Sequence, residues 1–162
     1  MPRGPEAEIQ KQVKNVYAVV GACLYDLSQG YRKERGGTRQ TPGIPDLWGF
    51  LPPPAGVSVT VEWENGKPTM ILPGLFWHEV KTTKGLADHH RLLAIPPAKV
   101  KPYQADDWNR AVAQARFRIL CEVRGIPYAI GGVEEAKELL LKVGLAYKDD
   151  RGTIFLGKRR AA

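Results

Sequence analysis

The sequence predicts an α/β fold in which helices flank a mixed β-sheet. In three segments, residues 5–30, 106–124 and 133–143, apolar residues recur every three or four positions, as in amphipathic helices. Between these segments lie short apolar or alternating runs that are typical of strands. With 162 residues, of which 43% are hydrophobic and 25% charged, the chain has the size and composition of a single domain spanning residues 1–162.

The first helix is expected to run from Pro5 to about Gly30, because proline suits the first turn of a helix and glycine commonly ends one. Its apolar face comprises Ile9, Val13, Val16, Val20, Cys23 or Leu24, and Leu27. The basic, glycine-rich segment 31–41 that follows is expected to form a short strand or an exposed loop.

Four strands are expected next. Residues 47–51 are apolar and stop at three prolines, as in a short buried strand. Residues 57–63 alternate between apolar and polar, and Asn65-Gly66 is a favoured two-residue hairpin turn that leads into residues 69–72. Residues 75–81 (LFWHEVK) predict the fourth strand.

The second half of the chain predicts two helices, a strand and a hairpin. One helix begins near Asp106 and ends at Gly125, with an apolar stripe of Trp108, Val112, Ala115, Ile119 and Val123. The other elements are a buried strand at 128–130, a helix at 133–143, a hairpin at 145–157 and the basic tail 158–162.

Residues 86–104 are expected to form an inserted loop, because they contain three prolines and no helical period. The adjacent residues His89 and His90 lie in this segment. Neighbouring side chains rarely chelate one ion, so the pair is not expected to bind a metal. His78, in contrast, is expected to be a packed or hydrogen-bonded residue of the sheet.

Charge and cysteine content narrow the class of function. The net charge of +7 favours an anionic partner, most commonly a nucleic acid. The two cysteines lack the spacing of a zinc site or a disulfide framework. The longest apolar run is too short to cross a membrane, and acidic residues stand where a signal peptide would be apolar, so we expect a cytoplasmic protein.

Candidate catalytic chemistry gathers at Asp46, Glu79 and Lys81. Residues two apart on a strand point to the same side, about 6–7 Å apart, so Glu79 and Lys81 can address one point in space. If Asp46 enters a neighbouring strand, it adds a second carboxylate, and carboxylate oxygens are the ligands that Mg²⁺ prefers. The lysine would stabilise negative charge in a phosphoryl-transfer transition state.

The Glu-x-Lys pattern has a simpler interpretation as an ion pair on an exposed sheet face. The sequence also contains a second copy, Glu135 and Lys137, in a predicted helix. Residues two apart on a helix do not face each other, so only in the first copy can the carboxylate and the ammonium group point toward the same place.

Five segments in order, EAEIQKQV, GIPDLWGF, WHEVKTTKG, AQARF and GIPYAIGGVEEA, resemble the VRR-NUC family of the PD-(D/E)XK nuclease superfamily. The resemblance implies a restriction-endonuclease-like mixed sheet flanked by helices, with an inserted β-hairpin at about 52–73 and a second insertion at about 86–104. It also implies hydrolysis of DNA phosphodiester bonds with Mg²⁺ or Mn²⁺.

The resemblance also implies which residues form the site. The metal would be bound by the carboxylates of Asp46, Glu79 and Glu8 and by the backbone carbonyl of Val80. Lys81 and Gln114 would complete the catalytic set. Two alternatives remain open, because Glu6 is close to Glu8 in the first helix and the insertion before Gln114 makes Gln104 a second candidate.

The expected substrate is branched DNA. Small stand-alone members of the family are similar to Holliday-junction resolvases, which implies a structure-specific endonuclease and a homodimer. Cleavage of flaps or nicks is the alternative substrate, and a catalytically inactive nucleic-acid-binding module is the alternative function. Basic residues expected to contact DNA phosphates are Arg32, Lys33, Arg35, Arg39 and Lys84.

Overall fold

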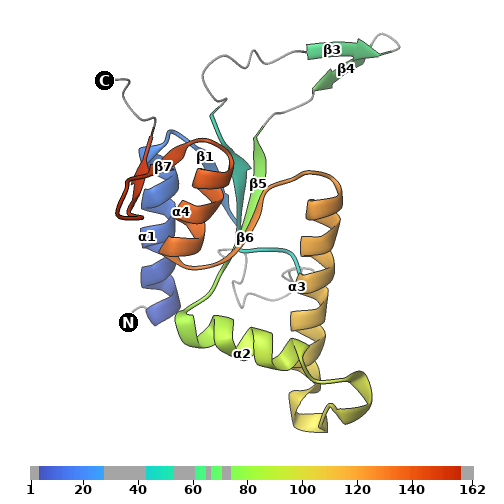
Figure 1. Ribbon diagram of the computed structural model, residues 1–162. Coiled ribbons are helices and arrows are strands. Elements are labelled where there is room, and N and C mark those ends of the chain that lie inside the picture. Colours follow the sequence, from blue (N-terminus) through green and yellow to red (C-terminus); the bar gives the residue numbers. More distant parts are fainter. Residues whose placement is uncertain (1–3, 28–42, 53–60, 65–66, 71–73, 158–162) are drawn as a thin grey trace.

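The computed structural model describes residues 4–27, 43–52, 61–64, 67–70 and 74–157 (Figure 1). Its centre is a four-stranded sheet in the order β1-β2-β5-β6, formed by β1 (Cys23–Asp26), β2 (Leu47–Phe50), β5 (Leu75–Val80) and β6 (Tyr128–Gly131). The first two pairings are antiparallel and β5–β6 is parallel. The sheet is therefore mixed, as predicted.

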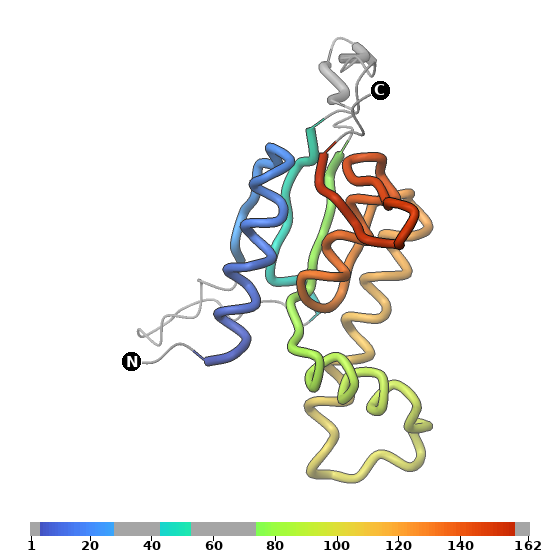
Figure 2. The backbone as a smooth tube through the Cα atoms, turned by 60° about the vertical axis from the view of Figure 1, so that its left-hand side comes forward, coloured from blue at the N-terminus to red at the C-terminus, as the bar shows by residue number. Residues whose placement is uncertain are grey.

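Helices lie on both sides of this sheet. The strands run between α1 (Pro5–Val19) and α3 (Ala105–Val123), as Figures 1 and 2 show. α4 (Val133–Lys142) packs against α1, and α2 (Thr83–Leu93) lies across the lower end of the molecule and packs against α3 (Figure 1). None of the described helices is long and apolar enough to span a membrane.

The hydrophobic core fills the space between the sheet and the α1–α4 pair. The Tyr17 ring of α1 contacts the Phe76 ring of β5 at 4.5 Å between centroids. The other buried core residues are Val13, Val16, Leu47, Leu51, Val80, Ala129, Ala136, Leu139, Leu140, Leu145 and Ala146. Alternation along β5 thus turns Phe76 and Val80 into this core and leaves Trp77 and Glu79 for the opposite face.

The opposite face carries a row of aromatic rings across all four strands. Tyr25, Trp48, Trp77 and Tyr128 are register partners in successive strands. Trp48 stacks on Tyr25 at 4.7 Å and on Trp77 at 5.9 Å between centroids. Phe117 of α3 packs edge-on against Trp77, which fixes α3 over β5 and β6.

The first helix ends eleven residues earlier than its apolar spacing predicts. Gly21, at φ 77°, adopts the left-handed conformation that ends many helices. The Gly21 N–H donates to the carbonyl of Ala18, and the Ala22 N–H to that of Tyr17. The chain then turns back as β1, so Cys23 and Leu24 belong to a strand and Leu27 follows it.

The expected loop at 86–104 is largely helical, which corrects the prediction. α2 covers residues 83–93, and two short 3₁₀ helices follow, η2 (Pro97–Lys99) and η3 (Pro102–Gln104). The Thr82 hydroxyl accepts a hydrogen bond from the Gly85 N–H and caps α2. The prolines lie beyond the end of α2 and therefore do not interrupt it.

The buried face of α3 also differs from the predicted apolar stripe. Ile119 and Val123 of that stripe are exposed, at 56% and 79%. The buried residues are Ala111, Gln114 and Cys121. The inward face includes the polar side chain of Gln114 because it has a hydrogen-bond partner in the sheet. The spacing of apolar residues cannot predict the burial of such a side chain.

The hairpin insertion contributes a separate antiparallel ribbon, β3 (Val61–Glu64) and β4 (Lys67–Met70), at the top of Figure 1. Its predicted turn, residues 65–66, lies outside the described residues. A hydrogen bond of 2.8 Å from the Leu51 N–H to the Gly74 carbonyl closes the base of the insertion. The predicted C-terminal hairpin is present as β7 (Ala146–Lys148) and β8 (Ile154–Leu156).

Candidate metal and catalytic site

The pairing of β2 with β5 brings Asp46 and Glu79 together. Leu47 is opposite His78, so one step further Asp46 is opposite Glu79, at the end of both strands. The Val80 N–H donates a 3.0 Å hydrogen bond to Oδ2 of Asp46. Two residues that lie 33 positions apart in sequence therefore meet at one end of the sheet.

Glu79 is buried, with 3% of its surface exposed. Its Oε1 accepts a hydrogen bond of 2.5 Å from Nζ of Lys81 and another from Nε2 of Gln114. Its Oε2 is buried and has no hydrogen-bond partner among the described residues. One carboxylate oxygen is thus fixed in place while the other keeps its capacity to bind a ligand.

The two carboxylates disfavour each other's charge. Burial, followed by the charge of Asp46, raises the pKa of Glu79 to about 7, although Lys81 opposes this shift. Burial also raises the pKa of Asp46, against the Val80 N–H and Lys81, which lower it. A cation beside the pair would favour the ionised form of both.

The backbone carbonyl of Val80 lies on the same side of β5 as Asp46. The N–H groups of Trp77 and Lys81 donate to Pro127 and Gly131, which flank or belong to β6. The N–H and C=O of one strand residue point to the same side, which alternates along the strand. The polar backbone groups of Val80 therefore point toward β2, where its N–H meets Asp46.

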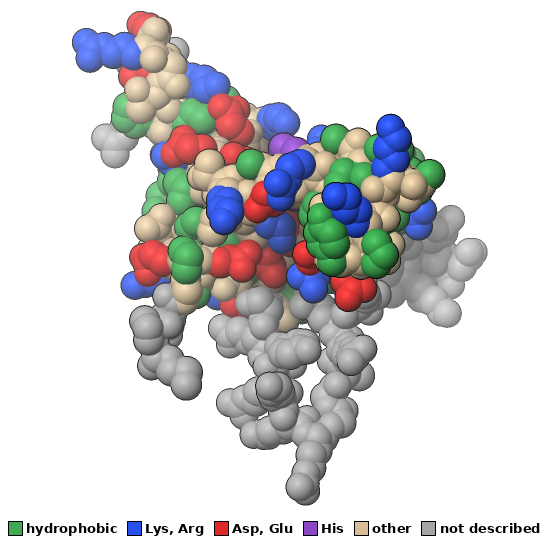
Figure 3. All heavy atoms as spheres, turned by 90° about the horizontal axis from the view of Figure 1, so that it is seen from below, with side chains coloured by type: hydrophobic (Ala, Val, Ile, Leu, Met, Phe, Trp, Pro, Cys, Tyr) green, Lys and Arg blue, Asp and Glu red, His purple; other side chains and the backbone are tan. Residues whose placement is uncertain are grey.

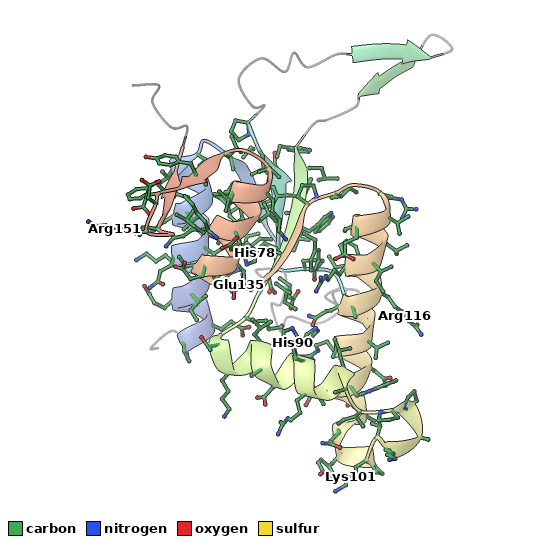
Figure 4. All side chains as sticks on the ribbon, in the orientation of Figure 1. His78, His90, Lys101, Arg116, Glu135 and Arg151 are labelled. Atoms are coloured by element: carbon green, nitrogen blue, oxygen red, sulfur yellow. The ribbon has the colours of Figure 1, made fainter. Side chains whose placement is uncertain are left out.

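The second Glu-x-Lys copy has a different role, as its helical setting predicts. Oε2 of Glu135 accepts a 2.8 Å hydrogen bond from the Gly132 N–H and caps α4 near the foot of that helix (Figure 4). Lys137 pairs with Glu134 instead, at 2.7 Å. The pair that lies on a strand, Glu79 and Lys81, is the one that forms a direct contact.

Between the two glutamates of α1, the electrostatics favour Glu6. Its negative charge raises the pKa of both Asp46 and Glu79. Both glutamates are exposed, and Glu8 makes no such contribution to either group. The electrostatics therefore favour Glu6, the alternative that the sequence left open.

Gln114, rather than Gln104, contacts β5. It is 6% exposed and donates to Glu79 from the middle of α3. Gln104 ends η3, ten residues earlier, which corresponds to about 15 Å along a helix. The helical phase shared by Gln114, Phe117 and Cys121 is the sequence signal that favours this choice.

Sequence reasoning missed His89. It lies on the inward side of α2 and is 8% exposed. Burial lowers its pKa, and so do the nearby positive charges of Lys81, His90 and Arg118. The three-residue spacing of Leu86, His89 and Leu92 is the signal for a helix with this inward face.

His78 is a structural residue, as its position in the strand predicts. It is fully buried on the core face, near the centre of Figure 4. Its Nε2 donates to the carbonyl of Gly131 at 3.1 Å, so its Nδ1 accepts from the Tyr17 hydroxyl at 2.8 Å. Burial lowers the pKa of His78 to about 4, and the ring is neutral.

Of the residues expected to contact DNA, Lys84 is exposed on the first turn of α2. The other four lie in residues 28–42, outside the described residues. That segment starts after Leu27, whose N–H donates to the backbone carbonyl of Asp46 at 2.8 Å. Seen from below, basic and acidic side chains are interspersed on the described surface (Figure 3).

The donor set suits a hard divalent cation. Two carboxylates and a backbone carbonyl offer oxygen atoms, and no described residue donates a hydrogen bond to the buried Oε2 of Glu79. Within the described ranges, no three His, Cys, Asp or Glu side chains gather into a group that could bind a metal ion. A cation here would keep several waters, as Mg²⁺ commonly does.

A search of protein-family models, of curated proteins and of solved structures finds no match to this chain.

Proposed function

We propose that the protein is a divalent-metal-dependent, structure-specific DNA endonuclease. The observation that carries this proposal is the meeting of Asp46, Glu79 and Lys81 at the ends of β2 and β5. Two carboxylates and an ammonium group at one point match the needs of phosphodiester hydrolysis. The net charge of +7 supports an anionic substrate.

Each residue has a separate task in this proposal. Asp46, Glu79 and the Val80 carbonyl would bind Mg²⁺ or Mn²⁺, with Glu6 strengthening the local negative potential. When bound, such a cation polarises a phosphodiester and lowers the pKa of a coordinated water. Lys81 stabilises the negative charge that develops on the phosphoryl oxygens. Gln114 orients the Glu79 carboxylate through its hydrogen bond.

The preferred substrate in this proposal is a four-way junction, and the active form is a homodimer. A junction has two-fold symmetry and needs two matched cuts, which two copies of one site supply. The protein would act in the cytoplasm of a bacterium or of a phage-infected cell. Light scattering should give the mass of a dimer.

The decisive experiment incubates the purified protein with labelled four-way junction, flap, nicked, single-stranded and linear duplex DNA, with Mn²⁺ or with EDTA. We expect cleavage of the junction in Mn²⁺, no cleavage in EDTA, and no cleavage by Asp46→Asn despite an unchanged circular dichroism spectrum. Metal-dependent cleavage retained by Asp46→Asn would exclude this site.

The same experiment separates the alternatives. Preferential cutting of flaps or nicks assigns the alternative substrate. DNA binding without cleavage under any condition assigns a catalytically inactive nucleic-acid-binding module.

A further inference from the structure

A pocket of about 230 Å³ lies beside the proposed catalytic site. Three element ends enclose it, namely the first turns of α1, the turn from β5 into α2, and the first turn of α4. These ends converge near the lower left of the sheet (Figure 1). The proposed mechanism does not use this space.

Lys81 belongs to both places. Its ammonium group contacts Glu79, and the residue also lines the pocket. A Cβ atom placed on Gly132 would lie 3.7 Å from the Lys81 carbonyl oxygen and 3.4 Å from a methyl carbon of Ile9. The start of α4 therefore lies within van der Waals reach of Lys81, and this lysine connects the pocket to the proposed catalytic site.

The walls and the rim of the pocket differ in chemistry. Ile9, Leu86 and Val133 supply aliphatic walls. Thr82, Thr83 and Gln12 add polar side chains to the lining, of which the Thr82 hydroxyl also caps α2. This combination suits a flat group with an apolar face and a hydrogen-bonding edge, which is the character of a nucleobase.

Two glutamates make the pocket unsuitable for a phosphate. Glu134 and Glu135 both line it, and neither is free of other contacts, because Glu134 pairs with Lys137 and Glu135 caps α4. Their negative charge repels an anion. Carboxylate oxygens accept hydrogen bonds from the amino groups of adenine, cytosine and guanine, which thymine lacks.

We propose that this pocket binds one unpaired base of the DNA substrate, from a nucleotide next to the phosphodiester at Asp46 and Glu79. The inference rests on the proposed nuclease function and gives a physical basis for recognition of DNA structure. Extruding a base from a duplex costs a few kcal/mol, and least where pairing is already lost. Branch points, bulges and mismatches would thus offer an unpaired base to the pocket, whereas in a continuous duplex every base is paired and stacked.

The test uses 2-aminopurine, a fluorescent base whose emission rises when it leaves the base stack. A duplex with one bulged 2-aminopurine is titrated with the full-length protein in EDTA, and DNA binding is followed in parallel by anisotropy. Thr83→Trp fills the pocket from an exposed position on α2, and Ala87→Trp, exposed one turn further along and outside the pocket, is the matched control.

We expect wild type and Ala87→Trp to raise the emission of the bulged base in step with binding. Thr83→Trp should lose this rise and bind the bulged duplex at least tenfold more weakly, with unchanged affinity for fully paired duplex. A bulged thymine should compete less well than a bulged adenine or cytosine. Normal DNA binding with no change in emission, or a full response in Thr83→Trp, would overturn the pocket assignment alone. Absence of any DNA binding would overturn the nuclease proposal and this inference with it.

Discussion

Glu79 occupies a position that would be costly for an isolated charge. Burial of a carboxylate without compensation favours its neutral form, and the pKa of about 7 reflects this cost. Lys81 and Gln114 compensate one oxygen only. A positively charged ligand would therefore stabilise the ionised form of this carboxylate, and the charges of the surrounding residues would set the affinity for that ligand.

The two Glu-x-Lys copies provide a matched test of the catalytic role proposed for Lys81. Lys81→Ala should lower the cleavage rate by about 10²- to 10³-fold, because it removes a charge that stabilises the transition state. Lys137→Ala should leave the rate unchanged, since Lys137 pairs with Glu134 on α4. The measurement is the single-turnover rate on junction DNA in Mn²⁺. Equal losses in both variants would contradict the assignment.

The two glutamates of α1 provide a second matched pair. Glu6→Gln should weaken Mn²⁺ binding several-fold in titration calorimetry, because the charge of Glu6 acts on both Asp46 and Glu79. Glu8→Gln should bind Mn²⁺ as the wild type does. Weaker Mn²⁺ binding by Glu8→Gln than by Glu6→Gln would instead assign Glu8 to the metal site.

Two buried groups should give the stability a characteristic dependence on pH. The pKa of His78 falls from 6.5 to about 4 in the folded protein, so between these values only the unfolded chain is protonated and stability decreases as the pH falls. The pKa of Glu79 rises from 4.5 to about 7, so this group makes stability decrease as the pH rises over that window. The two effects oppose each other in the wild type.

Glu79→Gln removes one of these effects. Its free energy of unfolding should fall by up to about 3 kcal/mol between pH 6.5 and pH 4, chiefly through His78, while the raised pKa of Asp46 opposes part of this fall. The wild type should change less over the same range. Urea unfolding at a series of pH values measures both, and parallel profiles for the two proteins would show that Glu79 is ionised throughout.

At the scale of elements, strand patterns and glycines predicted the sheet well. The expected strands at 47–51, 75–81 and 128–130 agree with β2, β5 and β6 within one residue at each end. The expectation that His78 is a packed, hydrogen-bonded residue of the sheet is confirmed, because it enters the core while Glu79 meets α3 on the other face. Alternation with a period of two leaves little ambiguity once one face is buried.

Helix ends and helix faces were predicted less well, for two physical reasons. The spacing of apolar residues continued from α1 into β1, and only the conformation of Gly21 marks the boundary. The inward face of α3 carries Gln114, whose burial depends on a partner 35 residues away. Apolar periodicity does not encode such long-range polar contacts.

Gly21 allows a test of that helix boundary. Gly21→Ala should lower the free energy of unfolding by about 1 kcal/mol, because an L-residue at φ 77° is strained although no atom lies close to the new Cβ. Gly4→Ala, which also has open space and no left-handed backbone, should be near neutral. Urea denaturation of both variants measures the difference, and an equal effect would place the boundary elsewhere.

At the scale of the whole molecule, the connection between β1 and β2 joins a group of basic residues to the proposed metal site. This connection begins after Leu27, which bonds to the backbone of Asp46, and carries Arg32, Lys33, Arg35 and Arg39. The 19 residues between Leu27 and Leu47 limit how far these charges can lie from the carboxylates. A phosphate backbone bound by them would pass near the site.

Salt dependence tests this link. Each phosphate contact adds about 0.9 to the slope of the logarithm of the DNA-binding constant against the logarithm of salt concentration. Replacing all four residues by alanine should lower the slope by about 2 to 4, whereas Arg151→Ala, on the far β7–β8 turn (Figure 4), should leave it unchanged. Fluorescence anisotropy from 50 to 300 mM salt gives the slope. An unchanged slope in the variant with all four substitutions would show that these residues do not contact DNA phosphates.

The closed base of the β3–β4 insertion has a consequence for evolution and for engineering. The chain leaves β2 after Phe50 and re-enters β5 at Leu75, the ends of these strands that lie away from Asp46 and Glu79. Because the Leu51–Gly74 hydrogen bond closes the base of the insertion, we expect that the segment between these residues can be shortened or replaced without moving the two acids. We therefore expect the number of residues between Asp46 and Glu79 to vary among related proteins. The same position should accept an inserted peptide, such as a binding segment or an affinity tag.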